Sequence, residues 1–236
     1  MTIARIYMEN LQAAEEEKTE KPKSIYEELF QLKNILKEFK YHSTEENNKN
    51  TKLASPEECY KRKYGICFDL TGAAAYIWKN VIKSKRTCRA IMEYMPKNTE
   101  PKSLYASHGC MTIEDDDGKS VFWLQPHMCA KCTIYKYTCY DSIYCDIQRE
   151  LISNNAGNIA WNFTGKSLYD QLKEKIINKI DEAKPHISLY DPLDEALYKG
   201  HPGIPEICKR ILKFYGEIDL NKVDPERMKD PVDQII

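Results

Sequence analysis

Apolar residues recur at helical spacing near the start of the chain. The order S-I-Y-E from Ser24 is typical of a capping box, in which the Ser and the Glu three residues later cap a helix N-terminus. The apolar positions that follow are three or four residues apart, and they are Ile25, Tyr26, Leu29, Phe30, Leu32, Ile35, Leu36 and Phe39. This pattern predicts a helix with one buried face.

Two further helices are predicted in the next forty residues. S-P-E-E from Ser55 places a Ser cap, a Pro at the first helical position and acids in the first turn, and this short helix should end near Gly65. From Cys67 onward, small and apolar residues repeat at three and four, at Leu70, Ala73, Ala74, Ile77, Trp78 and Val81. A buried helix therefore begins at or just before the cysteine, and Gly65 allows the turn between the two helices.

The pattern changes period after Lys85, which marks a passage from helices to a sheet. Four strands are predicted, at Thr87–Met95, Leu104–Glu114, Ser120–Met128 and Thr133–Tyr137. The second and third are joined by DDDG, a strong turn signal. Helices come first, then an antiparallel sheet, then helices, and this order predicts an α+β fold.

The last third of the chain predicts mainly helices. The stretch CYDSIYCDIQRELI is interpreted as a helix or a loop leading into one, and amphipathic helices are predicted at Ser167–Ala183 and Ile204–Tyr215. We divide the chain into a polar N-terminal arm over residues 1–23, a core over residues 24–150, and a helical C-terminal extension over residues 151–236 that packs on the core.

Composition and charge serve mainly to exclude classes of function. The 236 residues carry a net charge of −1 and no block of Lys and Arg, so there is no reason to expect binding to nucleic acid or to a membrane surface. No stretch approaches the roughly 20 apolar residues of a membrane span, and no secretory signal is recognisable. We expect a cytoplasmic protein whose nine cysteines are reduced thiols or metal ligands.

Cys67 is the main candidate for chemistry. A cysteine at a helix start is either a buried packing residue, the commonest state of a free cysteine, or a thiol whose thiolate is favoured by the helix dipole. A thiol nucleophile needs a base within reach, and the predicted strand LYASHGCMTIE supplies His108. Asp69, in the first turn of the helix, is better interpreted as a helix-start acceptor than as an acid catalyst.

The turn between the two strands decides which residue lies opposite His108. If DDDG forms a four-residue loop, His108 is opposite Gln125, whereas a two-residue turn at Asp117 and Gly118 places it opposite His127. In both registers, Gln125 and His127 are on the His108 face of the sheet. His127 is therefore a competitor for the residue that orients the His108 ring, or a metal ligand.

These elements together resemble the transglutaminase-like superfamily of cysteine enzymes. The resemblance rests on three runs, which are SPEECYKRKYGICFDLTGAAAYIW, ASHGCMTI and DDDGKSVFWLQP. Gly65, Cys67 and Asp69 match the family's Gly-x-Cys-x-Asp element at the start of the central helix, and His108 matches its strand histidine. The aromatic pair is matched by Phe122 and Trp123. The resemblance covers about residues 55–137 and implies a papain-like α+β core, with the nucleophile helix packed on an antiparallel sheet.

The resemblance also implies an activity. Cys67 would attack an acyl carbon of a protein or peptide substrate, and His108 would accept its proton. Gln125 stands where the family usually has a carboxylate; an amide can orient an imidazole but cannot stabilise an imidazolium as a charge does. The function expected first is therefore a thiol acyl-transfer enzyme (a cysteine protease, deamidase or transglutaminase). The alternative is an inactive transglutaminase-like fold that acts as a protein-binding module.

The cysteine-rich run after the third strand carries a metal alternative. Cys129 and Cys132 form a C-x-x-C pair, and Cys139 and Cys145 follow it. Tetrahedral zinc sites use two such pairs, but the second spacing is longer than usual. We therefore expect no cofactor for the reaction, and a structural zinc ion on these four cysteines is the less favoured possibility.

Overall fold

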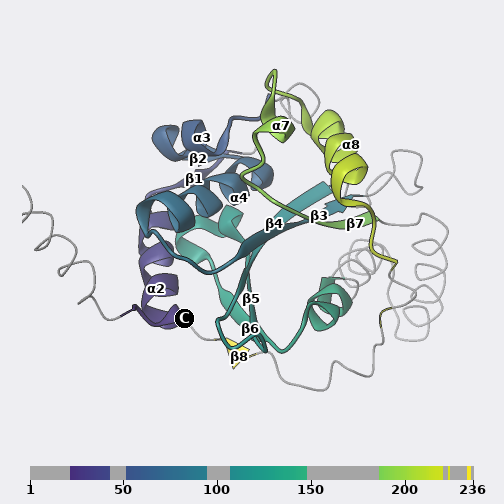
Figure 1. Cartoon of the computed structure of the whole chain (residues 1–236). Helices are drawn as coiled ribbons and strands as arrows, with labels where there is room; N and C mark the ends of the chain where they lie inside the picture. The colour runs from purple at the N-terminus through teal and green to yellow at the C-terminus, as the bar shows by residue number, and fades with distance from the viewer. Residues whose placement is uncertain are drawn as a thin grey trace, which may run out of the picture.

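An antiparallel sheet forms the centre of the molecule (Figure 1). The computed structural model describes residues 22–42, 52–94, 107–147, 186–219, 223 and 233–234. In the order β7-β3-β4-β5-β6-β8, the strands of the sheet are β7 (His186–Tyr190), β3 (Cys88–Tyr94), β4 (Ser107–Glu114), β5 (Val121–Leu124), β6 (Ile134–Tyr137) and β8 (Asp233–Gln234). Every neighbouring pair is antiparallel. The expected α+β class with an antiparallel sheet is confirmed.

One face of the sheet is covered by the predicted N-terminal helices. These are α2 (Ile25–Leu36), α3 (Pro56–Arg62) and α4 (Cys67–Tyr76), and a π-helical turn at Ile77–Val81 continues α4. Ser24 and Ser55 form the predicted capping boxes of α2 and α3. Buried residues of α2 and α4 share one apolar core with Met111 and Leu124 of the sheet. The buried faces of these helices are thus confirmed, but the apolar positions Tyr26, Phe30 and Val81 are exposed.

The same face continues over β3 and β7, where the C-terminal helices pack. They are α7 (Glu195–Tyr198) and α8 (Ile204–Tyr215), and Figure 1 shows α8 beside these two strands. Residues of α8 such as Ile207 and Ile211 share a core with Met92 and with Phe68 of α4. The predicted helix Ile204–Tyr215 is confirmed, and the predicted helix Ser167–Ala183 lies outside the described residues.

The opposite face of the sheet is covered by a helical stretch at residues 140–147. Its side chains Ile143 and Ile147 pack with Ile91, Cys110 and Trp123 of the central strands. Successive residues of a strand point to opposite faces. Met111 therefore faces α4, whereas its neighbour Cys110 faces the helical stretch.

The hairpin between β4 and β5 has the second of the two expected registers. Met111 pairs with Leu124 and Glu114 with Val121, so continued pairing places His108 opposite His127 and Gln125 opposite Cys110. The chain turns through residues 116–119, closed by a hydrogen bond from the N–H of Asp115 to the carbonyl oxygen of Ser120. The turn is longer than two residues, yet it keeps the register of the two-residue alternative.

Two predictions about strands need correction. The predicted strand Ser120–Met128 ends at Leu124, because Pro126 has no N–H for a ladder hydrogen bond and opens a 3-10 helix, η2 (Pro126–Lys131). The C-terminal extension was expected to be helical, but it also supplies β7, which pairs with β3. This part of the extension therefore belongs to the same sheet as the predicted core.

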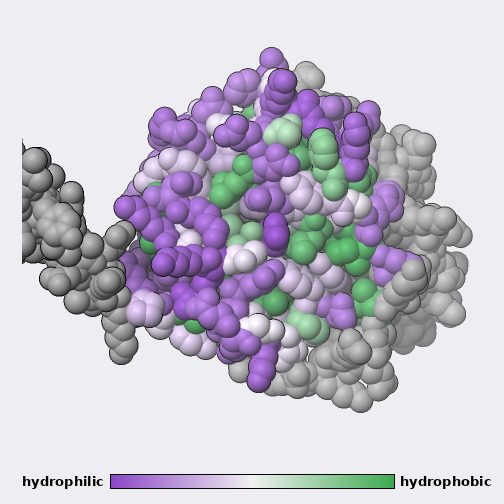
Figure 2. Space-filling model, in the orientation of Figure 1, coloured by the Kyte–Doolittle hydropathy of each residue, from purple (hydrophilic) through white to green (hydrophobic). Residues whose placement is uncertain are grey.

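The described surface agrees with this arrangement. On the face shown in Figure 2, hydrophilic residues predominate over α2 and α3, and hydrophobic residues lie in separate patches nearer the middle. Within the described ranges, each helix is too short or too polar to cross a bilayer.

Candidate active site around Cys67 and His108

Asp69 fixes the start of α4 and hence the position of Cys67. Its side chain is 1% exposed and accepts hydrogen bonds from the N–H of Ile66 at 3.2 Å and of Ala54 at 2.8 Å. Arg62 from α3 donates to the same carboxylate at 2.7 Å. The N–H of Ile66 just before the helix is thus capped, and α3 is tied to α4. The interpretation of Asp69 as a helix-start acceptor is confirmed.

Gly65 is required by the same arrangement. A Cβ at this position would lie 2.5 Å from Cβ of Asp69, a separation that real side chains do not tolerate. The glycine also belongs to β2 (Tyr64–Gly65), which pairs in parallel with β1 (Lys40–Tyr41). The spacing Gly-x-Cys-x-Asp is therefore explained by packing at the helix start, independently of any chemistry at the thiol.

Cys67 is the first residue of α4, and its side chain is largely buried. Burial is the largest effect on the thiol and raises its pKa to about 12. The backbone N–H groups of Gly109 and Phe68 are directed at the sulfur and lower the pKa, whereas the charges of Asp69 and Glu93 raise it. The expectation that the helix start favours the thiolate is therefore wrong for the resting protein, because desolvation outweighs the favourable donors.

Helix α4 approaches β4 closely at Gly109. A Cβ built on Gly109 would lie 3.3 Å from the Phe68 ring and 3.5 Å from Cα of Phe68. A side chain at this position would therefore press on the Phe68 ring, whereas the glycine leaves room for it. The consequence is that the Cys67 sulfur reaches the backbone of β4 one residue away from His108.

His108 is buried, and its ring contacts a second imidazole. The rings of His108 and His127 are edge to face, with centroids 4.5 Å apart, and the His127 ring lies 5.8 Å from that of Tyr41. Burial, with a smaller contribution from the charge of His127, lowers the pKa of His108 to about 3. Since Gly109 faces α4, strand alternation places the His108 side chain on the face of Cys110.

The predicted third residue is not the one that lies opposite His108. Gln125 precedes η2 as its N-cap, and its backbone N–H is directed at the sulfur of Cys132. His127 occupies the position across the hairpin, as the second of the two registers predicted. The structure therefore brings the Cys67 sulfur to the backbone of Gly109, and the His108 ring to His127. The hairpin register places His127, and not Gln125, across from His108.

The four cysteines considered as zinc ligands do not converge. Cys129 and Cys132 lie in the core between α2 and α4, where their thiols contact backbone carbonyl oxygens. Cys139 contacts the hydroxyl of Ser142, and Cys145 is buried beside it in the helical stretch. Among the residues that the structure describes, no group of three or more His, Cys, Asp or Glu side chains is arranged to hold a metal ion.

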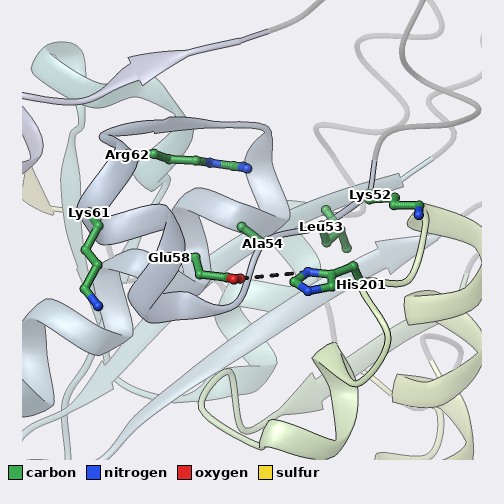
Figure 3. Close-up of a pocket in the computed structure, with 7 residues that line it drawn as sticks. All are labelled: Lys52, Leu53, Ala54, Glu58, Lys61, Arg62 and His201. Carbon is green, nitrogen blue, oxygen red and sulfur yellow. Dashed lines mark ion pairs between the residues drawn. The ribbon is translucent and has the colours of Figure 1, made fainter.

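A pocket of about 630 Å³ lies beside α3 (Figure 3). It is lined by Lys52, Leu53, Ala54, Glu58, Lys61, Arg62 and His201. Glu58 of α3 points toward His201, which follows α7, and the two form an ion pair of 3.8 Å. Cys67 and His108 do not line this pocket, and its partly exposed cation Arg62 is already paired with Asp69.

Comparison of the chain with protein-family models, with curated proteins and with solved structures finds no match. The fold and the site define the protein as an α+β protein with a thiol at the N-terminus of its central helix.

The first prediction concerns Gly65. Gly65→Ala should lower the free energy of unfolding by about 1–3 kcal/mol, the usual cost of overpacking, because the new methyl group collides with Asp69. Urea denaturation followed by tryptophan fluorescence measures this change. Lys61→Ala, on an exposed part of α3, is the control and should stay within about 0.5 kcal/mol of the parent. An unchanged midpoint for Gly65→Ala would contradict the packing described here.

The second prediction concerns acid sensitivity. The pKa of His108 is lowered from 6.5, the value for an unfolded chain, to about 3 in the folded protein. Between these two values the unfolded chain binds a proton and the folded protein does not. The free energy of unfolding therefore has its full value above pH 6.5 and decreases as the pH falls toward 3. Between about pH 7.5 and about pH 5 the loss is about 2 kcal/mol. His108→Gln should therefore lose less stability than the parent over this interval in urea denaturation. His201→Gln, at an exposed histidine, is the control, and equal losses in all three proteins would refute the prediction.

Proposed function

We propose that this protein is a transglutaminase-like thiol acyl-transfer enzyme with a papain-like core. Cys67 is the nucleophile and His108 is the base. The observation that carries the proposal is the placement of the Cys67 sulfur at the N-terminus of α4, where the N–H groups of Phe68 and Gly109 are directed at it. These donors favour a negatively charged sulfur, and Gly109 adjoins His108.

The reaction begins with proton transfer from the thiol to the imidazole. The sulfur then forms a bond to the acyl carbon, and the proton is delivered from His108 to the leaving amine. The first helical hydrogen bond of α4 runs from the N–H of Leu70 to the carbonyl oxygen of Ile66. The N–H of Cys67 thus has no acceptor within the helix and is available for the oxyanion of the tetrahedral intermediate.

The acceptor of the acyl group determines the class of reaction. Water gives a protease or deamidase, and a primary amine gives a transglutaminase. The substrate class proposed is a protein or peptide, because an acyl or carboxamide carbon is what a thiol and a base in this arrangement attack. The proposed site is made of protein groups only, and the proposed location is cytoplasmic.

The resting ionisation states restrict how the reaction proceeds. Burial holds Cys67 as a thiol and His108 as a neutral imidazole at neutral pH. A preformed thiolate and imidazolium pair is therefore a minor state, and proton transfer has to accompany attack on a bound substrate. General alkylating reagents such as iodoacetamide should consequently react slowly with Cys67, in contrast to the selective labelling expected for a thiol with a depressed pKa.

A second candidate function is supported by the same pKa values. A buried thiol with a raised pKa and a buried imidazole with a lowered pKa are also what an inactive relative would contain. In that case, the fold acts as a protein-binding module without chemistry. The two candidates differ in whether Cys67 forms an acyl adduct.

The third prediction tests this difference with an activated acyl ester, p-nitrophenyl acetate. Intact-protein mass spectrometry should detect one acetyl group, and peptide mapping should locate it on Cys67. Cys67→Ala should lose the adduct. His108→Gln should form it at least about 100-fold more slowly, because general base catalysis commonly contributes that factor or more.

The matched control is Cys59→Ala. Cys59 is also buried, and burial likewise raises its pKa to about 12, but it lies on α3, where its thiol contacts the carbonyl oxygen of Tyr64. This variant should acylate like the parent. An unmodified parent, or an adduct that persists in Cys67→Ala, would overturn the enzymatic proposal in favour of the binding module. If the adduct forms, addition of a primary amine distinguishes transamidation from hydrolysis by the product released.

A further inference from the structure

A buried carboxylate lies next to His108 on the strand that precedes it in the chain. Glu93 of β3 is 8% exposed, as is His108. The two residues are directly paired across β3 and β4, so their side chains emerge on the same face of the sheet. Side chains paired in this way have Cβ atoms about 5 Å apart, which is within reach of a glutamate and an imidazole.

The carboxylate of Glu93 turns toward β4. Its Oε1 atom lies 3.8 Å from the sulfur of Cys110, which is two residues beyond His108 on the same face. Cys110 is paired with Ile91, so this contact crosses the ladder diagonally. The carboxylate therefore lies over the part of β4 that carries His108 and Cys110, and the fold keeps it largely out of water.

Glu93 also acts on the nucleophile. Its negative charge contributes to the raised pKa of Cys67, which indicates that the carboxylate is close enough to affect the sulfur. An ionised carboxylate near a thiol opposes the free thiolate. It favours the state in which the proton has moved to an imidazole beside the carboxylate, because that imidazolium is then paired with a negative charge.

We propose that Glu93, rather than Gln125, is the carboxylate that positions the His108 imidazole and stabilises its protonated form. The inference rests on the proposed thiol acyl transfer. In the reaction, the proton moves from the Cys67 sulfur to His108 as the bond from sulfur to carbon forms. Glu93 accepts a hydrogen bond from the other ring nitrogen and itself gains no proton. Glu93 is thus a positioning residue, and it supplies the charge that the amide of Gln125 lacks.

The fourth prediction is tested on the full chain with Glu93→Gln. The substitution keeps the size of the side chain and removes the charge. Acylation by p-nitrophenyl acetate should slow by between about 10-fold and 10⁴-fold, the upper figure being the loss when the orienting acid of a serine protease triad becomes an amide. The ratio of the two neutral tautomers of His108, measured from ring nitrogen chemical shifts by NMR, should also change.

Glu114→Gln is the matched control. Glu114 lies on the same face of β4, and its carboxylate accepts a hydrogen bond from the Tyr140 hydroxyl at 2.9 Å rather than facing His108. This variant should retain both the parent acylation rate and the parent tautomer ratio. If Glu93→Gln lowers the melting temperature, Glu93→Asp supplies a second test, because it keeps the charge and should recover the parent tautomer.

The outcomes separate this inference from the proposed function. A parent protein that acylates on Cys67, with both the rate and the His108 tautomer unchanged in Glu93→Gln, overturns the role of Glu93 and leaves the proposed function standing. A parent protein that does not acylate removes the proposed function. The tautomer ratio then still decides whether Glu93 holds the ring: a change in Glu93→Gln supports the contact, and an unchanged ratio overturns it.

Discussion

The buried carboxylate of Asp69 is the interaction on which the rest of the site depends. It caps the start of α4, holds the backbone of Ala54 and takes the charge of Arg62. Burial costs this group enough that its pKa is raised despite the cation, so the hydrogen bonds and the ion pair offset a real desolvation penalty. The result is a helix N-terminus that cannot shift without breaking three contacts. The ion pair of Asp69 with Arg62 of α3 thus also holds the start of α4, and with it Cys67, against β4.

The site shows a conflict between burial and ionisation. The central helix approaches the sheet closely, with Phe68 packed against the backbone of Gly109. The same approach removes water from the thiol and from the nearby imidazole, which disfavours the charged form of each. For the proposed enzyme, the N–H donors at the sulfur favour the thiolate, and the carboxylate of Glu93 favours the imidazolium although it opposes the thiolate.

Much of the fold could be predicted from local signals. The capping boxes at Ser24 and Ser55, the start of α4 at Cys67 and the helix from Ile204 depend on short-range patterns, and all of them are present. β7 was missed because five residues between proline-containing segments carry little periodic signal. Strand β5 was made too long because the pattern of alternation ran through Pro126, which cannot continue a ladder.

The candidate site was predicted less completely, for reasons that lie in tertiary structure. Cys67 and His108 could be selected as candidates from their motifs, but the residue opposite His108 depends on hairpin register. The turn signal left that register open between Gln125 and His127. Glu93 precedes His108 in the sequence, and only the pairing of β3 with β4 places the two side by side. A search for a carboxylate in the segment after the histidine therefore could not find it. The raised pKa of Cys67 follows from burial of the thiol in the packed structure, which sequence spacing does not reveal.

The cysteines of the chain have a consequence for handling it. All nine are free thiols, and every one except Cys139 is buried in the folded protein. Oxygen and disulfide reagents therefore meet few thiols while the chain is native, but an opened chain presents all nine at once and can cross-link in many non-native pairings. Refolding requires a reductant throughout. Without a reductant, the rate at which free thiols are lost from a native sample measures the rate at which the core opens transiently.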